Sequence, residues 1–315
     1  ASFLSSDWKA LGLSDNSLAA SVGNMERTLV NVTYRLSYLN ETLAAAVGKT
    51  GQKLNIANAL VLTGGDVSKA YKTILTSYYD AEVFPGGLDA INGWVKQKTE
   101  AKIEKILDKL DPDSVCVILN AIYFKGIWER QFDKSRTQDA PFNVSATTRV
   151  NAPLMYQKSD FKLLAGEDFH ALSIPYKGKN MSMVILLPKA MDGLPALEEK
   201  LNHQTLEKWL ADLDGQTPQK VTLYLPKFKV EAGYDLVSPC KTMGMKDAFE
   251  MLSADFSGMG WPKGKLYISQ IKHKAFVEVN EEGTEAAAAT AVEMATKSMP
   301  GAPAVFRADH PFLYL

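Results

Sequence analysis

Apolar residues recur at helical spacing mainly in the first third of the chain. Between residues 17 and 47 they return every three or four positions, which is the period of an amphipathic helix. The same spacing predicts helices over residues 66–80, 88–110 and 194–212. Along 88–110, lysines interleave with acidic residues, which indicates a solvated face with i,i+4 ion pairs rather than a binding site for a polyanion.

Strands are predicted for the middle and the end of the chain. Residues 54–62 begin with the alternation of apolar and polar side chains that a half-buried strand shows, and the apolar runs at 114–124 and 181–187 are typical of buried strands. Residues 221–230 flank a Pro-Lys pair, which predicts two strands or one bent strand, and 274–279 reads as another. Helices come mostly first and do not alternate regularly with strands, which indicates an α+β fold with a large antiparallel or mixed sheet.

Composition narrows the class of protein. The 315 residues are 46% hydrophobic and 23% charged, which is typical of a folded chain with a sizeable core. Lys and Arg number 35 against 36 Asp and Glu, so the formal charge of -1 gives no basic excess for binding nucleic acid. No run of 18 apolar residues occurs, so we expect no membrane-spanning helix and no membrane partner.

Cysteines and glycosylation motifs bear on the compartment. Two cysteines are too few for a disulfide framework or a four-ligand zinc site. Cys116 lies in an apolar run and is expected to be a buried, inert thiol, with a bridge to Cys240 as the alternative. The chain opens without a signal peptide, so it is either a mature or a cytoplasmic form. Four Asn-x-Ser/Thr motifs favour a secreted glycoprotein; they begin at Asn31, Asn40, Asn143 and Asn180.

Motifs of enzymes are missing from the sequence. There is no Gly-rich phosphate loop, no Gly-x-Ser-x-Gly, no His-Glu-x-x-His and no Cys-x-x-Cys. We therefore expect no enzyme, no catalytic residue, no cofactor and no metal. An unrelated α+β enzyme with an unmarked active site stays an alternative, because a nucleophilic triad can assemble from distant residues.

One segment near the end has an unusual composition. Residues 281–300 are rich in small side chains, and every second position from Thr284 to Met294 is uncharged. The segment reads either as a surface helix or as a strand with one buried face. Small side chains would let such a strand enter a preformed sheet without overpacking.

This segment resembles the hinge of the reactive-centre loop in inhibitory serpins, beginning Glu-Glu-Gly-Thr-Glu-Ala-Ala-Ala-Ala-Thr. Other runs are similar to motifs of the same family, in the right order, over roughly residues 50–315. They are residues 54–59, 91–103, 119–128, 225–228 and 308–312. The resemblance implies a serpin fold, with large mixed or antiparallel sheets, surrounding helices and an exposed reactive-centre loop at about 281–305. Residues 1–315 would form a single serpin domain that lacks the family's first helices and its last two core strands.

The resemblance implies an irreversible suicide-substrate inhibitor. Counting seventeen residues from the hinge glutamate Glu281 places the reactive bond at Lys297–Ser298. A lysine before the bond suits a trypsin-like serine protease, which would be held in a covalent acyl complex while the upstream arm inserts into the main sheet. Met294 or Met299 would serve a chymotrypsin-like protease instead. A non-inhibitory serpin with a carrier, storage or chaperone role is the further alternative. The chain is expected to act as a monomer.

Further roles carry over by position from the resemblance. Trp128, Asn120 and His273 would lie where the main sheet opens. Lys227 would pair with Glu281, and we expect modest stabilisation because exposed ion pairs contribute about 0–1 kcal/mol. The implied loop hinge comprises Glu281, Glu282, Gly283, Thr284, Glu285, Ala286, Ala287, Ala288 and Ala289.

Overall fold

The computed structural model describes residues 52–283 and 303–315, which fall into two compact units. Of the described residues, the first unit contains 53–124 and 230–277, and the second contains Gln52, 125–229, 278–283 and 303–315. The helix predicted over 17–47 and the reactive bond lie outside the described residues.

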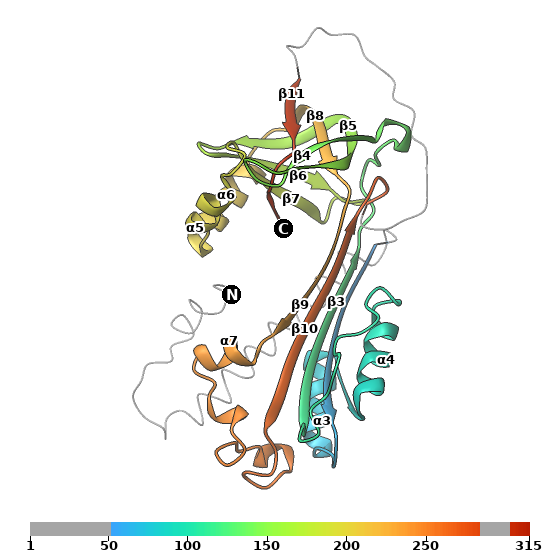
Figure 1. The fold of residues 1–315 in the computed structure, drawn as a ribbon, viewed down its shortest axis with the longest axis vertical. Coiled ribbons are helices and arrows are strands. Elements are labelled where there is room, and N and C mark those ends of the chain that lie inside the picture. The colour runs from blue at the N-terminus through green and yellow to red at the C-terminus, as the bar shows by residue number, and fades with distance from the viewer. Residues whose placement is uncertain (1–51, 284–302) are drawn as a thin grey trace. The chain divides into compact units, whose positions relative to one another are not determined.

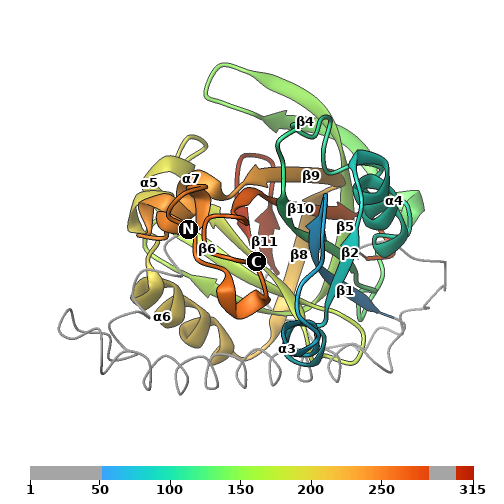
Figure 2. The same ribbon diagram turned by 90° about the horizontal axis from the view of Figure 1, so that it is seen from below.

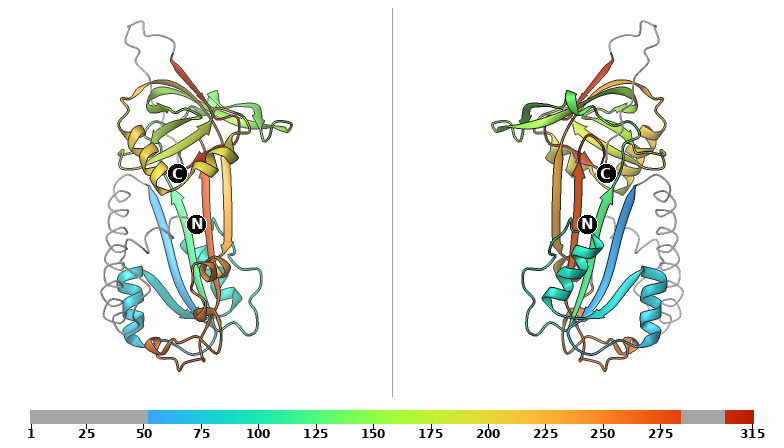
Figure 3. Two further views of the ribbon diagram at one scale, coloured as in Figure 1. Left: turned by 90° about the vertical axis from the view of Figure 1, so that its left-hand side faces the viewer. Right: turned by 90° about the vertical axis from the view of Figure 1, so that its right-hand side faces the viewer.

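A five-stranded sheet forms the framework of the first unit, with strand order β2-β1-β3-β10-β9 (Figure 1). Its strands are β1 (Lys53–Leu62), β2 (Ala81–Pro85), β3 (Cys116–Lys125), β9 (Phe228–Asp235) and β10 (Ile268–Val279). β3 and β10 are parallel neighbours (Figure 3). In their register, Asn120 lies opposite His273. These strands confirm the predictions at 54–62, 114–124 and 274–279. In β1, however, burial increases along the strand instead of alternating, and only the last four residues are fully buried.

Side chains on the two faces of this sheet pack into two hydrophobic cores. One face carries Val117 and is covered by α4 (Leu88–Lys98). The other carries Cys116 and is covered by α3 (Lys69–Tyr79), α7 (Val237–Thr242) and the short helices η3 (Asp247–Phe249) and η4 (Ser257–Met259). Cys116 is 1% exposed, and burial raises the pKa of its thiol to about 12. The predicted burial of Cys116 is confirmed, and both cysteines are free, so no bridge joins it to Cys240.

The helix predicted over 88–110 is too long. Helix α4 ends at Lys98, because Glu100 and Ala101 adopt left-handed backbone angles, with φ of 51° and 60°. The expected i,i+4 spacing differs from the pairs found here: Lys105 pairs with Asp108 at i,i+3, Lys98 pairs with Glu82, and Glu100 pairs with Lys53. The interleaved charges were therefore correctly interpreted as a solvated surface, but most of them do not lie on a helix.

The residues after α4 still pack against the sheet. Ile103 and Leu107 are buried in the same core as α4. The side chain of Asn92 takes the place of helical hydrogen bonds: its Oδ1 accepts from the backbone N–H of Ile106 at 2.9 Å and of Leu107 at 3.1 Å. The apolar pattern thus identified core positions correctly, although the backbone there is irregular.

The second unit is built on a seven-stranded sheet with the path β11-β8-β5-β6-β7-β12, and β4 pairs with β5. The strands are β4 (Gln138–Asn143), β5 (Arg149–Ala165), β6 (Phe169–Pro175), β7 (Ser182–Pro188), β8 (Gln219–Pro226), β11 (Ala304–Arg307) and β12 (Leu313–Tyr314). β7 confirms the prediction at 181–187. β8 and β9 confirm two strands, not one bent strand, around the Pro-Lys pair.

The helix predicted over 194–212 is two helices, α5 (Leu194–Lys200) and α6 (His203–Asp214), which lie beside the strands of this sheet (Figure 2). Asn202 begins α6 with a capping box: its side chain accepts from the backbone N–H of Thr205, whose hydroxyl accepts from the backbone N–H of Asn202. The apolar spacing continues through both segments, which is why the sequence predicted one helix. The N-cap at Asn202 divides it into two.

Within residues 52–283 and 303–315, no helix is long and apolar enough to cross a bilayer. The same ranges contain no group of three or more His, Cys, Asp or Glu side chains placed to hold a metal ion.

Candidate functional site

The hinge segment reverses the chain direction directly after β10. The backbone N–H of Asn280 donates to the carbonyl oxygen of Gly283 at 2.9 Å, and the N–H of Gly283 donates back to Asn280 at 3.2 Å. Glu281 and Glu282 therefore form the tip of a two-residue hairpin turn. We call residues 280–283 the hinge turn.

A neighbouring segment, residues 126–132, holds the hinge turn through the backbone. The N–H of Phe132 donates to the carbonyl oxygen of Glu281 at 2.8 Å, and the N–H of Trp128 donates to that of Glu282 at 3.1 Å. Ile127 forms an antiparallel bridge with Gly283. These bonds hold both glutamates and Gly283 of the turn against residues 126–132.

Gly283 is required by this close approach. Its φ of +142° is strained for any residue with a Cβ, and a Cβ built there would overlap the carbonyl oxygen of Gly126 and lie 2.7 Å from Cα of Ile127. The glycine of the hinge motif thus has a local steric reason.

Glu281 is buried and fully paired. Its Oε2 lies 3.0 Å from Nζ of Lys227, and its Oε1 accepts from the hydroxyl of Thr137 at 2.8 Å. Burial raises the pKa of Glu281, but the hydrogen bonds from Lys227, the backbone and Thr137 outweigh this effect, so the pKa lies below its ordinary value.

The pair of Lys227 with Glu281 differs from the expected exposed pair. The side chain of Glu281 is 5% exposed and that of Lys227 is 38% exposed. Removing the lysine would therefore leave an uncompensated buried carboxylate, which costs more than losing a surface pair. Thr137 has no sequence signal, because a single threonine in a loop is unremarkable.

Glu282 has a separate partner that the sequence did not indicate. Its carboxylate pairs with Lys134, the first residue of the short helix η2 (Lys134–Arg136). The side chain of Glu282 is 10% exposed and that of Lys134 is 63% exposed. The hydrogen bond to Glu282 and the charge of that carboxylate raise the pKa of Lys134.

Trp128 forms a rigid support beneath the turn. It is 1% exposed, and its Nε1–H donates to the carbonyl oxygen of Asn280 at 2.9 Å. Its ring stacks on Tyr176, with centroids 4.6 Å apart and planes 6° apart, and meets Phe132 edge-on. The position expected for Trp128 from the resemblance thus coincides with a contact to the hinge turn.

In the first unit, Asn120 and His273 join β3 to β10. Nδ1 of His273 lies 2.7 Å from Oδ1 of Asn120, and Nδ2 of Asn120 donates to Oδ1 of Asn58 on β1 at 2.7 Å. Because an amide oxygen only accepts, Nδ1 of His273 carries the proton. Burial lowers the pKa of His273, which favours the neutral ring.

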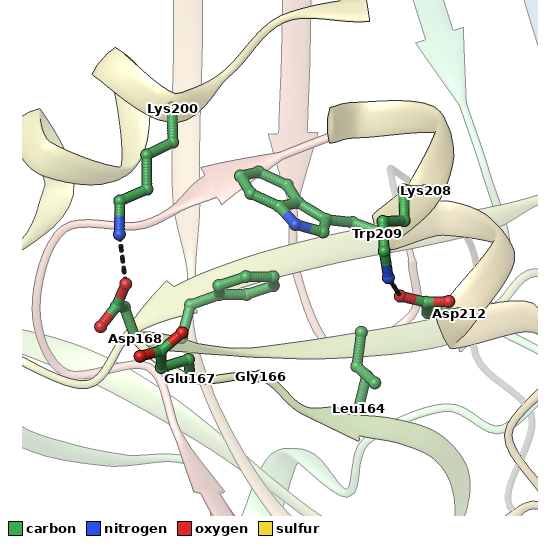
Figure 4. A pocket seen from close by; sticks show the side chains of 9 residues that line it. Leu164, Gly166, Glu167, Asp168, Lys200, Lys208, Trp209 and Asp212 are labelled. Atoms are coloured by element: carbon green, nitrogen blue, oxygen red, sulfur yellow. Dashed lines mark hydrogen bonds and ion pairs between the residues drawn. The ribbon is translucent and has the colours of Figure 1, made fainter. Parts of the chain in front are cut away.

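A separate pocket in the second unit has a volume of about 270 Å³ and lies between the β5–β6 turn and helices α5 and α6 (Figure 4). Phe169 and Trp209 form its aromatic wall, with ring centroids 4.7 Å apart. Its charges largely compensate one another: Lys200 pairs with Asp168, and Lys208 pairs with Asp212 at 2.5 Å.

Two candidate glycosylation sites can be placed. Asn180 is exposed in the turn between β6 and β7. Asn143 is 6% exposed, and its backbone N–H and side-chain Nδ2 both donate to the carbonyl oxygen of Asp309, at 2.8 and 3.2 Å. Asn143 therefore has a packing role that a glycan on Nδ2 would disrupt.

The remaining predicted site residues lie outside the described ranges. They are Asn31, Asn40, Thr284, Glu285, Ala286, Ala287, Ala288, Ala289, Met294, Lys297, Ser298 and Met299.

The sequence and the fold are similar to those of known proteins. Residues 9–315 match the family model described as serpin (serine protease inhibitor). Serpin B6 of Macaca fascicularis is 40% identical over 289 residues, which cover 87% of this chain and 76% of the relative. The native structure of tengpin, a thermophilic serpin, has a TM-score of 0.73 and 30% identity over 84% of this chain and 69% of its own. Human thyroxine-binding globulin, in a complex with thyroxine, has a TM-score of 0.76 and 29% identity over 86% of this chain and 73% of its own.

The family model and the relatives agree with the α+β architecture, and the described strands and helices belong to the serpin fold. The chain therefore belongs to the serpin family, whose description is that of serine protease inhibitors.

Proposed function

We propose that this serpin is a suicide-substrate inhibitor of trypsin-like serine proteases. The observation that carries the proposal is the hinge turn. Because Asn280 and Gly283 form a two-residue hairpin, an arm that continues in the same direction runs antiparallel to β10.

The sheet of the first unit offers a place for such an arm. β3 and β10 are parallel neighbours, so one strand inserted between them can run antiparallel to both. Antiparallel pairing is slightly more stable per residue than parallel pairing, and the added strand gains hydrogen bonds on two sides. The small, uncharged side chains at every second position from Thr284 to Thr290 suit this insertion, because they avoid overpacking between layers.

The proposed chemistry belongs to the protease. Its serine Oγ attacks the carbonyl carbon of Lys297, the bond to the nitrogen of Ser298 breaks, and that nitrogen takes the proton from the protease histidine. The product is an acyl ester of Lys297. Insertion of the arm then distorts the protease before water hydrolyses the ester. Lys297 supports trypsin-like specificity, because a lysine side chain pairs with an aspartate at the base of the specificity pocket.

The test is incubation of the chain with trypsin and with chymotrypsin. The expected result is a complex with trypsin that survives SDS and is lost in Lys297→Ala. A second expected result is a higher melting temperature after cleavage of the loop. Thr284→Arg, which places a bulky charge on the inserting face, should convert the inhibitor into a substrate. Simple turnover of the unchanged loop by trypsin, with equal melting temperatures before and after cleavage, would contradict the proposal.

A carrier role is the second candidate, favoured by the pocket at Trp209. Its aromatic wall suits a flat apolar ring, and its rim offers charges of both signs. Thyroxine, which is bound in the structure of thyroxine-binding globulin, is a suitable probe. Saturable binding by calorimetry that Trp209→Ala abolishes would support this role, and absence of binding heat would remove it.

A secreted, glycosylated form stays part of the proposal. Exposed Asn180 supports it, whereas buried Asn143 does not. A decrease in mass on enzymatic removal of N-glycans from protein taken from its natural source is the expected result, and an unchanged mass would contradict it.

A further inference from the structure

We propose that Lys134 and Glu282 form a latch, a contact that must break before the hinge turn can open, and that this latch acts in addition to the pair of Lys227 with Glu281. The consequence for inhibition rests on the proposed function, but the contact itself concerns only the hinge turn.

Two adjacent buried carboxylates make the arrangement unusual. Glu281 is 4% exposed and Glu282 is 7% exposed, and each has its own lysine from a different part of the second unit. Lys227 directly follows β8, whereas Lys134 begins η2. Because buried carboxylates are costly without a partner, two separate cations are needed to keep both charges in one turn.

The hinge turn does not need the charge of Glu282 for its own geometry. The backbone N–H of Glu282 donates to Oδ1 of Asn280 at 3.0 Å, and its carbonyl oxygen accepts from the backbone of Trp128 and the side chain of Gln131. A glutamine at this position would keep all of these bonds. In the described part of the chain, the partner of the carboxylate is Lys134.

The latch acts on the same segment that holds the backbone of the turn. Trp128 and Phe132 donate their amides to the hinge carbonyl groups, and Lys134 follows two residues later. The pair therefore ties a side chain of the turn to the segment that already binds its backbone. Opening the turn would break the backbone bonds and the ion pair together.

The two partners differ in exposure, because the side chain of Lys134 is 63% exposed and that of Glu282 is 10% exposed. Substituting one or the other should therefore have different effects. Lys134→Ala leaves a nearly buried carboxylate unpaired beside Glu281. Glu282→Gln leaves only an exposed, hydrated lysine, because Lys134 is 63% exposed. We therefore expect Lys134→Ala to loosen the hinge turn more than Glu282→Gln, and the double variant to behave like Glu282→Gln alone.

The experiment measures amide hydrogen exchange at Trp128 and Phe132 in the full chain, with the rate of complex formation with trypsin as a second reading. In Lys134→Ala, exchange at both amides is expected to rise about fivefold, the size of effect seen for coupled contacts. Lys134→Arg should restore the original rate. Lys220→Ala, which removes an ion pair with Asp160 elsewhere in the same unit, is the matched control and should leave these amides unchanged.

The outcomes separate this inference from the proposed function. Equal exchange in Lys134→Ala and the unchanged chain, or additive effects in the double variant, would overturn the latch. If Lys134→Ala does not fold, Glu282→Gln and Lys134→Arg still test the latch. The latch requires that amide exchange be faster in Glu282→Gln than in the unchanged chain, and that it be unchanged in Lys134→Arg. Failure of the unchanged chain to form any protease complex, together with the expected exchange pattern, would contradict the proposed function and support the latch.

Discussion

Asn280 and Gly283 bond to each other in both directions through their backbones, at 2.9 and 3.2 Å, so the chain turns back on itself directly after β10. A turn this tight depends on what packs against it. Trp128 supports it from one side, and the lysines of two ion pairs fix the glutamates at its tip. The hinge turn is therefore a structured element, and single substitutions can measure how much each contact stabilises it.

Gly283→Ala is expected to destabilise the intact protein by about 2 kcal/mol, because the added Cβ overlaps Gly126 at a φ that alanine avoids. Denaturant unfolding followed by tryptophan fluorescence measures the change. Gly64→Ala is the matched control, since nothing lies within 4 Å of a Cβ built there. Equal loss in both variants would contradict the steric argument.

Trp128 should respond differently to two substitutions. Trp128→Phe can keep an aromatic ring against Tyr176 but loses the bond to Asn280, at a cost of about 1 kcal/mol. Trp128→Ala also leaves a cavity and should cost about 3–5 kcal/mol. Unfolding free energies of the two variants give the comparison, and similar losses in both would show that the hydrogen bond, not the stacking, dominates.

The ionised carboxylate of Glu281 is expected to make the stability of the folded protein depend on pH in the acidic range. Because the pKa of this carboxyl is lowered in the folded state, its contribution is fully present above the ordinary value of 4.5 and is lost as the pH falls through the lower, folded-state pKa. The melting temperature of the unchanged protein should therefore exceed that of Glu281→Gln at pH 6. The difference should shrink as the pH falls below 4.5, and a constant difference would contradict the assignment.

His273 is expected to cause a second pH dependence of stability, at a higher pH than that of Glu281. Burial lowers the pKa of the ring, so the folded state binds the proton less readily than the unfolded state. Stability is full above the ordinary value of 6.5 and declines as the pH falls below it. His273→Gln should flatten this part of the pH profile, whereas His203→Gln, on the exposed surface of α6, should keep it. An unchanged profile in His273→Gln would rule out this origin.

Local patterns predicted the strands well and the ends of helices poorly. Apolar runs locate β3 and β7 because burial dominates there, whatever the neighbouring segments do. The period of 3.6 residues continues through residue 110, yet α4 ends at Lys98. The pattern records which side chains are buried, and it cannot show that Asn92 will satisfy the backbone of a non-helical segment.

The sequence predicted residues of the candidate site only where they lie in a motif that resembles the family. Trp128, Asn120 and His273 were identified by resemblance, and each lies in a specific contact. Their partners were not, because Asn58 and Thr137 are ordinary polar residues brought close by the fold. Lys134 is separated from Glu282 by 148 positions, so no local pattern links them.

The parallel neighbours β3 and β10 divide the five-stranded sheet along a seam. Ser269 Oγ donates across it to the carbonyl oxygen of Cys116 at 2.7 Å, His273 reaches Asn120 at mid-strand, and Phe276 meets Tyr123 further along. The bond from Asn120 to Asn58 stays within one half. Parting β3 from β10 would break these contacts, whereas the backbone pairing of β3 with β1 and of β10 with β9 lies on either side of the seam and would be kept.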